Sequence, residues 1–231
     1  MKENQDKKKN DKLVAVIAIA TLLVGVIGAT YAYFVSQIGA AATANVNLTT
    51  GTNDVVTFST GSAITIGPLT QANFGSGAGD KSGTTTAVAA LTANNQANVA
   101  TNAYCYKAYL TITTNNLVYT SGTTPELVLN VVKKVYQNKT AITTTGTATS
   151  TTNLITDKDI TTGTTTVNFP TTAGGSTTSV GKHSFLATTK SKVTTDVFEV
   201  TVTFKNLNSD QQLNAGKTFS GVIHIENMAC S

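Results

Sequence analysis

The sequence contains no tryptophan and no arginine, and it has only three prolines, two cysteines and two histidines. Charged residues make up 12% of the 231 residues, whereas roughly a quarter is usual in soluble globular domains. These shortages argue against a typical cytosolic enzyme and against an acidic disordered chain. Threonine is in excess, at about a fifth of the chain, and this β-branched residue favours strands that turn its hydroxyl to water. The composition therefore predicts a β protein whose outer faces are covered by hydroxyls.

The lack of arginine also bears on nucleic-acid binding. The net charge is +4 and the pI is near 9.0. Five of the 16 lysines crowd at the N-terminus before Leu13, however, and beyond Ala32 the remaining lysines and acids almost balance. Proteins that bind nucleic acids usually carry a basic stripe and arginine forks that grip phosphate. We therefore expect no nucleic-acid partner.

The two histidines do not fit a zinc protease. We expect His183 in a loop and His224 on a strand, about forty residues apart, without the H-E-x-x-H pattern that places two ligands one helical turn apart. His224 and Glu226 share a strand face and could touch a metal, but an exposed polar face explains them better. "NAGKTFSG" lacks the upstream glycine of a phosphate-binding loop, and G-x-S-x-G does not occur. We expect no enzyme, and no catalytic, cofactor-binding or metal-binding residues.

One long apolar run stands near the N-terminus. Leu13–Val35 carries no charge, and as a helix it would span roughly 35 Å, enough for the core of a bilayer. Lysines precede the run and none follows closely, so the positive-inside rule keeps the N-terminus in the cytoplasm and exports the rest. The run is either a membrane anchor or a signal that is removed, and both readings involve the membrane during export.

The end of this run favours removal. Thr30 and Ala32 are small residues at the spacing that a signal peptidase accepts, which predicts cleavage between Ala32 and Tyr33. The alternative rests on length, because the run is longer than most cleaved signals. In that case Tyr31, Tyr33 and Phe34 form the interfacial aromatic belt of a retained anchor.

Short apolar runs separated by Gly, Asn, Ser and Pro predict an all-β body. The clearest strand is "DVFEVTVTFKN", where Phe198, Val200, Val202 and Phe204 alternate with Glu199, Thr201 and Thr203. "YCYKAYLTI" and "FSGVIHIE" alternate in the same way. "ELVLNVVKKVY" is apolar on both faces at its centre, as in an inner strand or a short helix. We predict an antiparallel, jelly-roll-like β-sandwich preceded by the N-terminal apolar helix.

Two segments have the composition of loops. Residues 75–86 ("GSGAGDKSGTTT") suggest a flexible connection. Residues 140–181 are dense in Thr, Gly and Ser, and they form either a long decorated loop or an extra hairpin. We therefore divide the chain into a leader over 1–32, an N-terminal segment over 33–50, and a β-sandwich over 51–231 that carries the 140–181 insertion.

The two cysteines invite a disulfide in an exported chain. Cys105 and Cys230 each lie opposite the inward face of their strands, which is compatible with neighbouring strands of one sheet. We favour a bond within the chain. Two free thiols, or a bond between subunits, are the alternatives.

The start of the chain resembles a known class of leader. A lysine-rich start, an apolar run with "GVIGATYAYF" and a polar β-rich continuation are similar to the leaders processed by the SipW-type signal peptidase. Proteins of the TasA/camelysin family of Gram-positive bacteria carry such leaders, and "ANNQANVATNAYCYKAYLTI" and "VTFKNLNSDQQLNAGKTFSGVIHIE" also resemble that family. The resemblance implies a secreted or cell-surface β-sandwich, in a family best known for subunits of extracellular matrix fibres. The metalloprotease attribution of camelysin finds no residues here to carry it.

Cleavage before Tyr33 would free a segment, "YFVSQIGAAATANVNL", that has no partner. Such a segment can add as a strand to an open sheet edge of a neighbouring copy, and head-to-tail donation propagates into a filament. The candidate donor-strand residues are Phe34, Val35, Ile38, Val46 and Leu48.

We therefore expect a secreted structural subunit of an extracellular fibre or biofilm matrix. Its partners would be further copies of itself and the signal peptidase. The first alternative is a membrane-anchored surface adhesin that keeps its N-terminal helix, and the second is a camelysin-type surface protease. In a third reading, the freed segment folds back onto its own domain and the protein stays monomeric.

Overall fold

The computed structural model describes residues 46–49, 54–94, 98–100 and 103–230, all within the compact unit Thr43–Ser231. The predicted cleavage site at Ala32 and Tyr33, and the donor candidates Phe34, Val35 and Ile38, lie outside the described residues. In the part of the chain that is described, no helix has the length and apolar character needed to cross a membrane.

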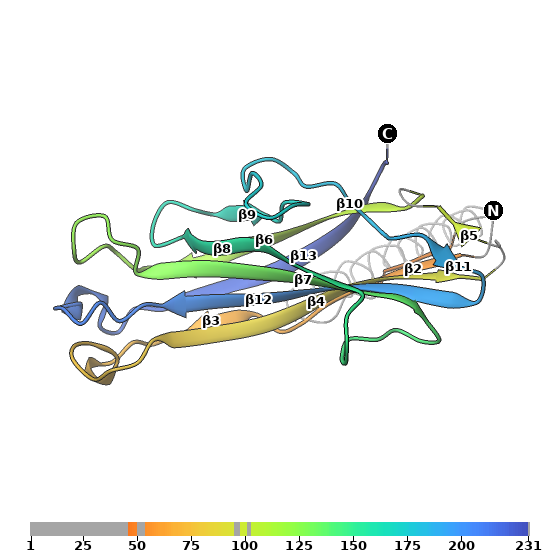
Figure 1. The fold of residues 1–231 in the computed structure, drawn as a ribbon. Coiled ribbons are helices and arrows are strands. Elements are labelled where there is room, and N and C mark those ends of the chain that lie inside the picture. Colours follow the sequence, from red (N-terminus) through yellow and green to blue (C-terminus); the bar gives the residue numbers. More distant parts are fainter. Residues whose placement is uncertain (1–45, 50–53, 95–97, 101–102, 231) are drawn as a thin grey trace, which may run out of the picture. The chain divides into compact units, whose positions relative to one another are not determined.

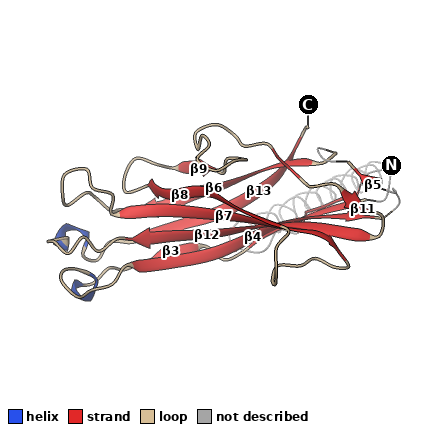
Figure 2. Ribbon diagram, viewed as in Figure 1, coloured by secondary structure: helices blue, strands red, loops and turns tan. Residues whose placement is uncertain are grey.

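The fold is built from antiparallel strands in two main sheets (Figures 1 and 2). The six-stranded sheet runs β1 (Val46–Thr49), β2 (Val55–Thr60), β4 (Lys81–Ala93), β12 (Lys192–Phe204), β7 (Leu127–Lys139) and β8 (Ser150–Asp159). The five-stranded sheet runs β10 (His183–Ser184), β6 (Cys105–Asn115), β13 (Phe219–Met228) and β3 (Ile64–Ile66), and β9 (Thr166–Asn168) also pairs with β6. A small pair, β5 (Asn98–Val99) with β11 (Thr188–Thr189), and two 3-10 turns, η1 (Gln71–Asn73) and η2 (Gln212–Asn214), complete the described elements. The prediction of an all-β, antiparallel fold is confirmed.

β12 organises the larger sheet because it pairs along its length with β4 on one side and with β7 on the other. Its predicted alternation is confirmed, since Phe198, Val200 and Val202 are buried and Glu199 and Thr201 are partly exposed. The β-branched and aromatic residues that dominate this strand are those that pack best on a pleated surface. β12 is therefore the inner strand on which the sheet is assembled.

The core lies between the two sheets. Tyr106 of β6 packs edge-on against Phe198 of β12, with ring centroids 6.2 Å apart. Ile223 and Ile225 of β13 are buried on the same side of their sheet, whereas Glu226 is exposed, as the alternation predicts. Removing this apolar surface from water, worth about 25 cal/mol per Å², is the main source of stability. The result is a sandwich-like arrangement of two sheets.

Residues 127–136 form part of the inner strand β7 and not a short helix, because both β12 and β8 pair with that strand. The prediction of a flexible connection over residues 75–86 is wrong in its second half. β4 already begins at Lys81, and Thr85 lies opposite Val200 of β12. Gly83 is required there, since a Cβ on it would lie 2.8 Å from the carbonyl oxygen of Thr65 in β3.

The Thr-rich stretch 140–181 contains strands of both sheets. β8 forms an antiparallel hairpin with β7, and β9 pairs with β6 in the second sheet. Its apolar islands are anchored in the core, with Leu154, Val167 and Phe169 completely buried. The stretch is thus neither a plain loop nor a hairpin of its own, because its strands pair with β7 and β6 and not with each other.

Candidate functional site

The sheet edges are the candidate site for assembly, because an unpaired row of N–H and C=O groups can accept another strand. The larger sheet ends at β1 on one side and at β8 on the other. The smaller sheet ends at β3 on one side, and at β9 and β10 on the other. The two edges of the larger sheet differ in how they are protected.

The β8 edge carries several features that discourage strand addition. Its pairing with β7 contains two register shifts. Asp157 adopts a left-handed conformation with φ of 43°, and it stands beside the charged residues Lys158 and Asp159. The loop after β9 also covers part of the edge, since the amide of Gly174 donates to the carbonyl of Leu154 at 3.2 Å. A second copy would find this edge bent, charged and partly occupied.

The β1 edge has none of these charges. The sequence contains no charged residue between Lys12 and Asp54, and Asp54 itself is buried. β1 pairs with β2 in register, Val46 opposite Phe58 and Leu48 opposite Val56. Two of the predicted donor residues, Val46 and Leu48, therefore lie in a strand that pairs with β2 of their own chain. This edge is short, uncharged and continuous with the segment that precedes it.

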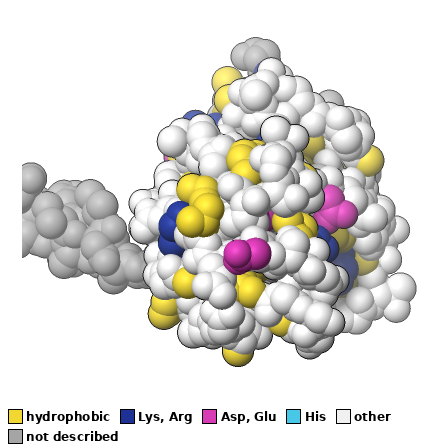
Figure 3. Space-filling view, turned by 90° about the vertical axis from the view of Figure 1, so that its left-hand side faces the viewer, with side chains coloured by type: hydrophobic (Ala, Val, Ile, Leu, Met, Phe, Trp, Pro, Cys, Tyr) yellow, Lys and Arg dark blue, Asp and Glu magenta, His cyan; other side chains and the backbone are white. Residues whose placement is uncertain are grey.

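The outer surface is rich in hydroxyls and poor in net charge. On the outer face of the larger sheet, Ser82 of β4 and Thr203 of β12 share a hydrogen bond of 2.8 Å. The Lys134 ammonium on this face lies 2.6 Å from the carboxylate of Glu199. Figure 3 shows an end of the molecule on which charged side chains are few among neutral atoms. Copies can approach such a surface with little electrostatic repulsion.

A polar hollow of roughly 480 Å³ opens beside the point where the chain leaves β2. Its lining is Gly61, Ser62, Thr84, Thr85, Thr86, Glu199, Val200 and Thr201. The one carboxylate in this lining, Glu199, is already paired with Lys134. The hollow therefore adds no net charge to the β1–β2 side of the larger sheet.

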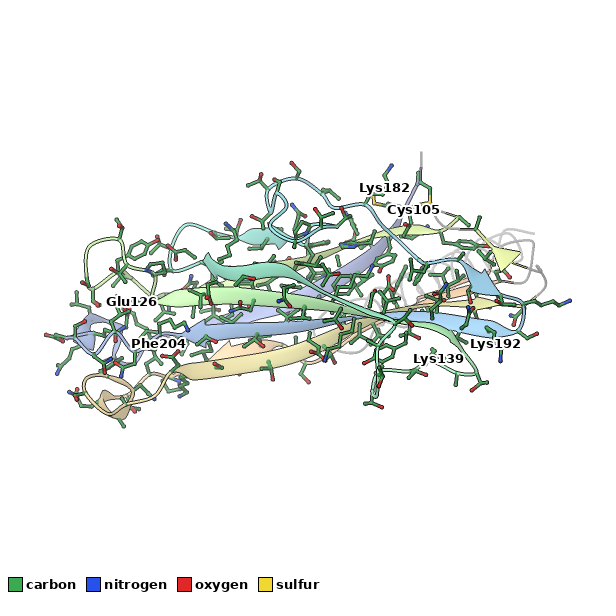
Figure 4. The ribbon with its side chains drawn as sticks, in the orientation of Figure 1. Cys105, Glu126, Lys139, Lys182, Lys192 and Phe204 are labelled. Carbon is green, nitrogen blue, oxygen red and sulfur yellow. A yellow bond between two sulfur atoms is a disulfide. The ribbon has the colours of Figure 1, made fainter. Side chains whose placement is uncertain are left out.

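The predicted disulfide is present within the chain. Cys105, at the start of β6, is bonded to Cys230, which follows β13. Met228 lies opposite Cys105 in the β6–β13 ladder, and Cys230 follows two residues later, beyond the end of β13. Figure 4 shows the sulfur bridge near Lys182, far along the sandwich from Glu126. The bond fixes the C-terminal end of β13 to the start of β6.

His224 and Glu226 share the outer face of β13, as predicted, in a cluster of side chains from β6 and β13. The His224 ring stacks on Tyr109 with centroids 5.0 Å apart, and Lys107 lies 2.8 Å from the Glu226 carboxylate. Hydrogen bonds from Lys107 and Tyr109 lower the pKa of Glu226. Burial, and then the bond to Glu226, raise the pKa of Tyr109 to about 12. Across the described residues, no three His, Cys, Asp or Glu side chains gather to hold a metal.

A buried polar cluster in the core was not predicted. The Lys133 ammonium lies 2.7 Å from Oδ2 of Asp196, and their side chains are 13% and 1% exposed. Tyr106, from the opposite sheet, donates its hydroxyl hydrogen bond to the same oxygen. Within the described residues, Oδ1 of Asp196 and Oγ1 of Thr194 are buried without a hydrogen-bond partner. The buried carboxylate thus has both its contacts on one oxygen.

The sequence did contain a signal for this cluster. Lys133 has the same alternation as Leu129 and Val131 on β7, and Asp196 has that of Phe198 on β12. No prediction was made for these two charged residues. Because every second residue of a strand faces the same side, the alternation along β7 and β12 would have placed both Lys133 and Asp196 inside.

His183 belongs to the same region, and the prediction that it lies in a loop is wrong. It forms β10 and pairs with Tyr106, where it is 2% exposed. Its Nε2–H donates to the carbonyl of Phe169 at 3.0 Å. Burial, assisted by the nearby Lys133 charge, lowers the pKa of His183 to about 3. The ring is therefore neutral in the folded protein at ordinary pH.

Glu126 forms a second buried polar centre at the far end of the sandwich (Figure 4). One carboxylate oxygen accepts hydrogen bonds from the amide and hydroxyl of Thr120. The other accepts from Gln211 at 2.8 Å and from Asn214 at 2.7 Å. Full satisfaction by neutral donors is what allows a carboxylate to be buried. Glu126 therefore joins the β6–β7 connection to the β12–β13 connection.

The chain matches no family model, no curated protein and no solved structure.

Proposed function

We propose that this protein is a secreted structural subunit of an extracellular fibre or matrix, assembled by exchange of its N-terminal strand. The observation that carries the proposal is the contrast between the two edges of the larger sheet. β8 is bulged and charged, whereas β1 and the sequence before it carry no charge back to Lys12. Soluble sheets usually protect an edge that must stay unpaired. An edge left without charge is suited to pairing.

In the proposed assembly, residues 33–45 of one copy lie against the next copy, and residues 46–49 pair there with the six-residue strand β2. They take the place that Val46–Thr49 occupies on β2 within a single chain. The pairs within and between copies are alike, so exchange of β1 alone changes little energy. In the proposal residues 33–45 supply the difference, because the apolar side chains of Phe34, Val35 and Ile38 are buried against the neighbouring copy. Since the donor and acceptor surfaces differ, the chain of contacts does not close and a filament grows.

Two further features support an exported structural role. The disulfide Cys105–Cys230 belongs to an oxidising compartment. The TasA/camelysin resemblance of the leader supports a Gram-positive cell surface as the location and a jelly-roll-like sandwich as the fold. In this proposal no catalytic residue or cofactor is needed.

The test is to compare three forms of the mature chain, residues 33–231, by negative-stain microscopy and sedimentation. The unchanged chain should form fibres. The double variant Val35→Asp and Ile38→Asp should remain monomeric with an unaltered circular dichroism spectrum, because charge in the donor strand opposes its burial. The matched control, Thr156→Asp on the exposed side of β8, should still form fibres.

Three outcomes would overturn the proposal. The unchanged chain could remain a monodisperse monomer across salt and pH, which would mean that the segment folds back onto its own domain. Fibres could form from the donor variant, or the β8 variant alone could abolish them. The last result would move the assembly surface to the opposite edge.

A further inference from the structure

We infer that Lys133 and Asp196 are joined by a covalent amide bond between their side chains, formed without an enzyme, which links β7 to β12. Nothing in the fibre proposal requires this bond, and it stands on a different part of the molecule. The residues meet on the inward faces of two adjacent strands, Lys133 opposite Phe198 and Asp196 opposite Val135. This diagonal relationship is within reach of a lysine side chain.

The reacting atoms are already in contact. Nζ of Lys133 lies 2.7 Å from Oδ2 of Asp196. It is therefore no more than about 4 Å from Cγ, close to the roughly 3–3.5 Å of a near-attack arrangement. The strand ladder holds both backbones, so the fold fixes this geometry. Holding two groups in this way replaces a collision in solution by a reaction within one molecule.

The pair is largely shut off from water, since the side chains of Lys133 and Asp196 are 13% and 1% exposed. Lys133 lies over the rings of Tyr106 and Phe198, with Nζ 5.8 Å and 5.7 Å from their centroids. Transfer of a proton from the ammonium to Oδ2 gives an amine and a carboxylic acid without changing the number of protons. An apolar site lowers the cost of that transfer, because charged groups are expensive to bury. The amine so produced is the nucleophile.

The step balances with no outside reagent. The Nζ electron pair attacks Cγ of the protonated Asp196, forming the C–N bond, and the bond from Cγ to Oδ2 breaks. Nζ gives up one proton, which reaches Oδ2 through the Tyr106 hydroxyl, and Oδ2 leaves as one water molecule. Nothing is oxidised or reduced. Oδ1 remains as the amide carbonyl.

The hydrogen bonds around Asp196 agree with these roles. The departing oxygen, Oδ2, is the one that Tyr106 and Lys133 contact. Burial and the Asp196 charge raise the pKa of Tyr106 well above its usual value, so its hydroxyl keeps a proton to donate. Oδ1 accepts no hydrogen bond from the described residues. That is costly for a buried carboxylate and milder for an amide oxygen.

The protein contains its own control pair. Lys134 and Glu199 lie on the same two strands with Nζ 2.6 Å from Oε1, but their side chains are 31% and 39% exposed on the outer face. Water keeps both groups charged there, and a charged ammonium has no electron pair to attack with. We expect this pair to remain an ordinary ion pair.

The experiment is mass spectrometry of the full chain, purified with its disulfide reduced and alkylated. Trypsin should yield a branched product in which residues 108–134, uncut after Lys133, are joined to residues 193–205. Its mass should be that of the two peptides less one water. Fragmentation should place the link between Lys133 and Asp196.

Variants separate the two lysines. Lys133→Met and Asp196→Ala should each abolish the branched product. Lys134→Met should still give a branched product that contains residues 193–205, with a mass one water less than the sum of its two peptides. If a core variant does not fold, the unchanged chain still decides the matter. Two separate, unmodified peptides from the folded unchanged chain would overturn the inference, as would a link that moves to Lys134.

Discussion

Tyr106 and His183 stack in the core with ring centroids 5.4 Å apart and ring planes 19° apart. The pair joins β6 to β10, and Phe198 from the facing sheet packs edge-on against His183 with centroids 5.1 Å apart. A protonated imidazole has no place in this packing. His183 therefore stays neutral in the folded protein to a lower pH than it does in the unfolded chain.

His183 makes stability depend on pH. Its pKa falls from 6.5 to about 3 on folding. Below pH 6.5 the unfolded chain therefore binds one more proton than the folded protein, and stability decreases as the pH is lowered. The contribution of this ring is fully present above pH 6.5 and declines toward about pH 3. Between about pH 7 and pH 5 we expect a loss of about 2 kcal/mol in the free energy of unfolding. Urea unfolding at a series of pH values measures it.

His183→Gln should flatten that pH dependence between pH 5 and pH 7, because the titrating ring is gone. The matched control is His224→Gln on the outer face of β13, which should leave the slope of the wild type unchanged. An equal slope in the His183 variant would mean that another group titrates.

Glu126→Gln, a change that keeps the size and shape of the side chain, should destabilise the folded protein. In Glu126→Gln the new NH₂ group faces donors from Thr120, Gln211 or Asn214, so at least one buried hydrogen bond is lost. We expect a cost of about 1.5–3 kcal/mol, the range for hydrogen bonds to a charged group. Asp210→Asn, an exposed change in the same connection, should cost well under 1 kcal/mol. The shift in urea midpoint at constant m-value distinguishes them.

The disulfide should contribute strongly to stability. The bond closes a loop with a sequence separation of 125, for which the chain-entropy estimate is about 4–5 kcal/mol. The double variant Cys105→Ala and Cys230→Ala should lose about that amount in denaturant unfolding. Alkylation of the folded wild type without reductant should label neither cysteine, and a reducible dimer would contradict the bond within one chain.

Processing of the leader is expected between Ala32 and Tyr33. Protein recovered from the surface or medium of the producing cell should begin at Tyr33 or within a few residues of it. Intact mass measurement reads this directly. Retention of residues 1–32 would instead favour the anchored adhesin, and the N-terminal strand would then not be free to donate.

The strands with strict alternation were predictable, because an apolar residue at every second position shows which face of the strand is buried. β12 and β13 are such strands, and their inward residues Phe198, Val200, Ile223 and Ile225 are buried as predicted. The cysteine pairing was predictable for another reason, since the sequence holds only two cysteines in a chain expected to be exported. Here local sequence and tertiary structure agree.

Other elements depend on partners far away in the chain. Residues 81–86 read as a linker because Thr and Gly say little locally, and only the ladder with β12 makes them a strand. His183 was read as a loop residue for the same reason, since its two-residue strand exists only against β6. Lys133 and Asp196 were missed because each charge is acceptable inside only when the other is present.

The bridge between Cys105 and Cys230 also decides how a fibre of such subunits would respond to tension. A pull on the C-terminus passes through the sulfur atoms into the first residue of β6, instead of acting only on the free end of β13. β13 therefore cannot be peeled from its neighbour one hydrogen bond at a time, starting from Met228. The pull acts on β6 and β13 together, so the hydrogen bonds that would yield first are those that hold this pair to the rest of the subunit.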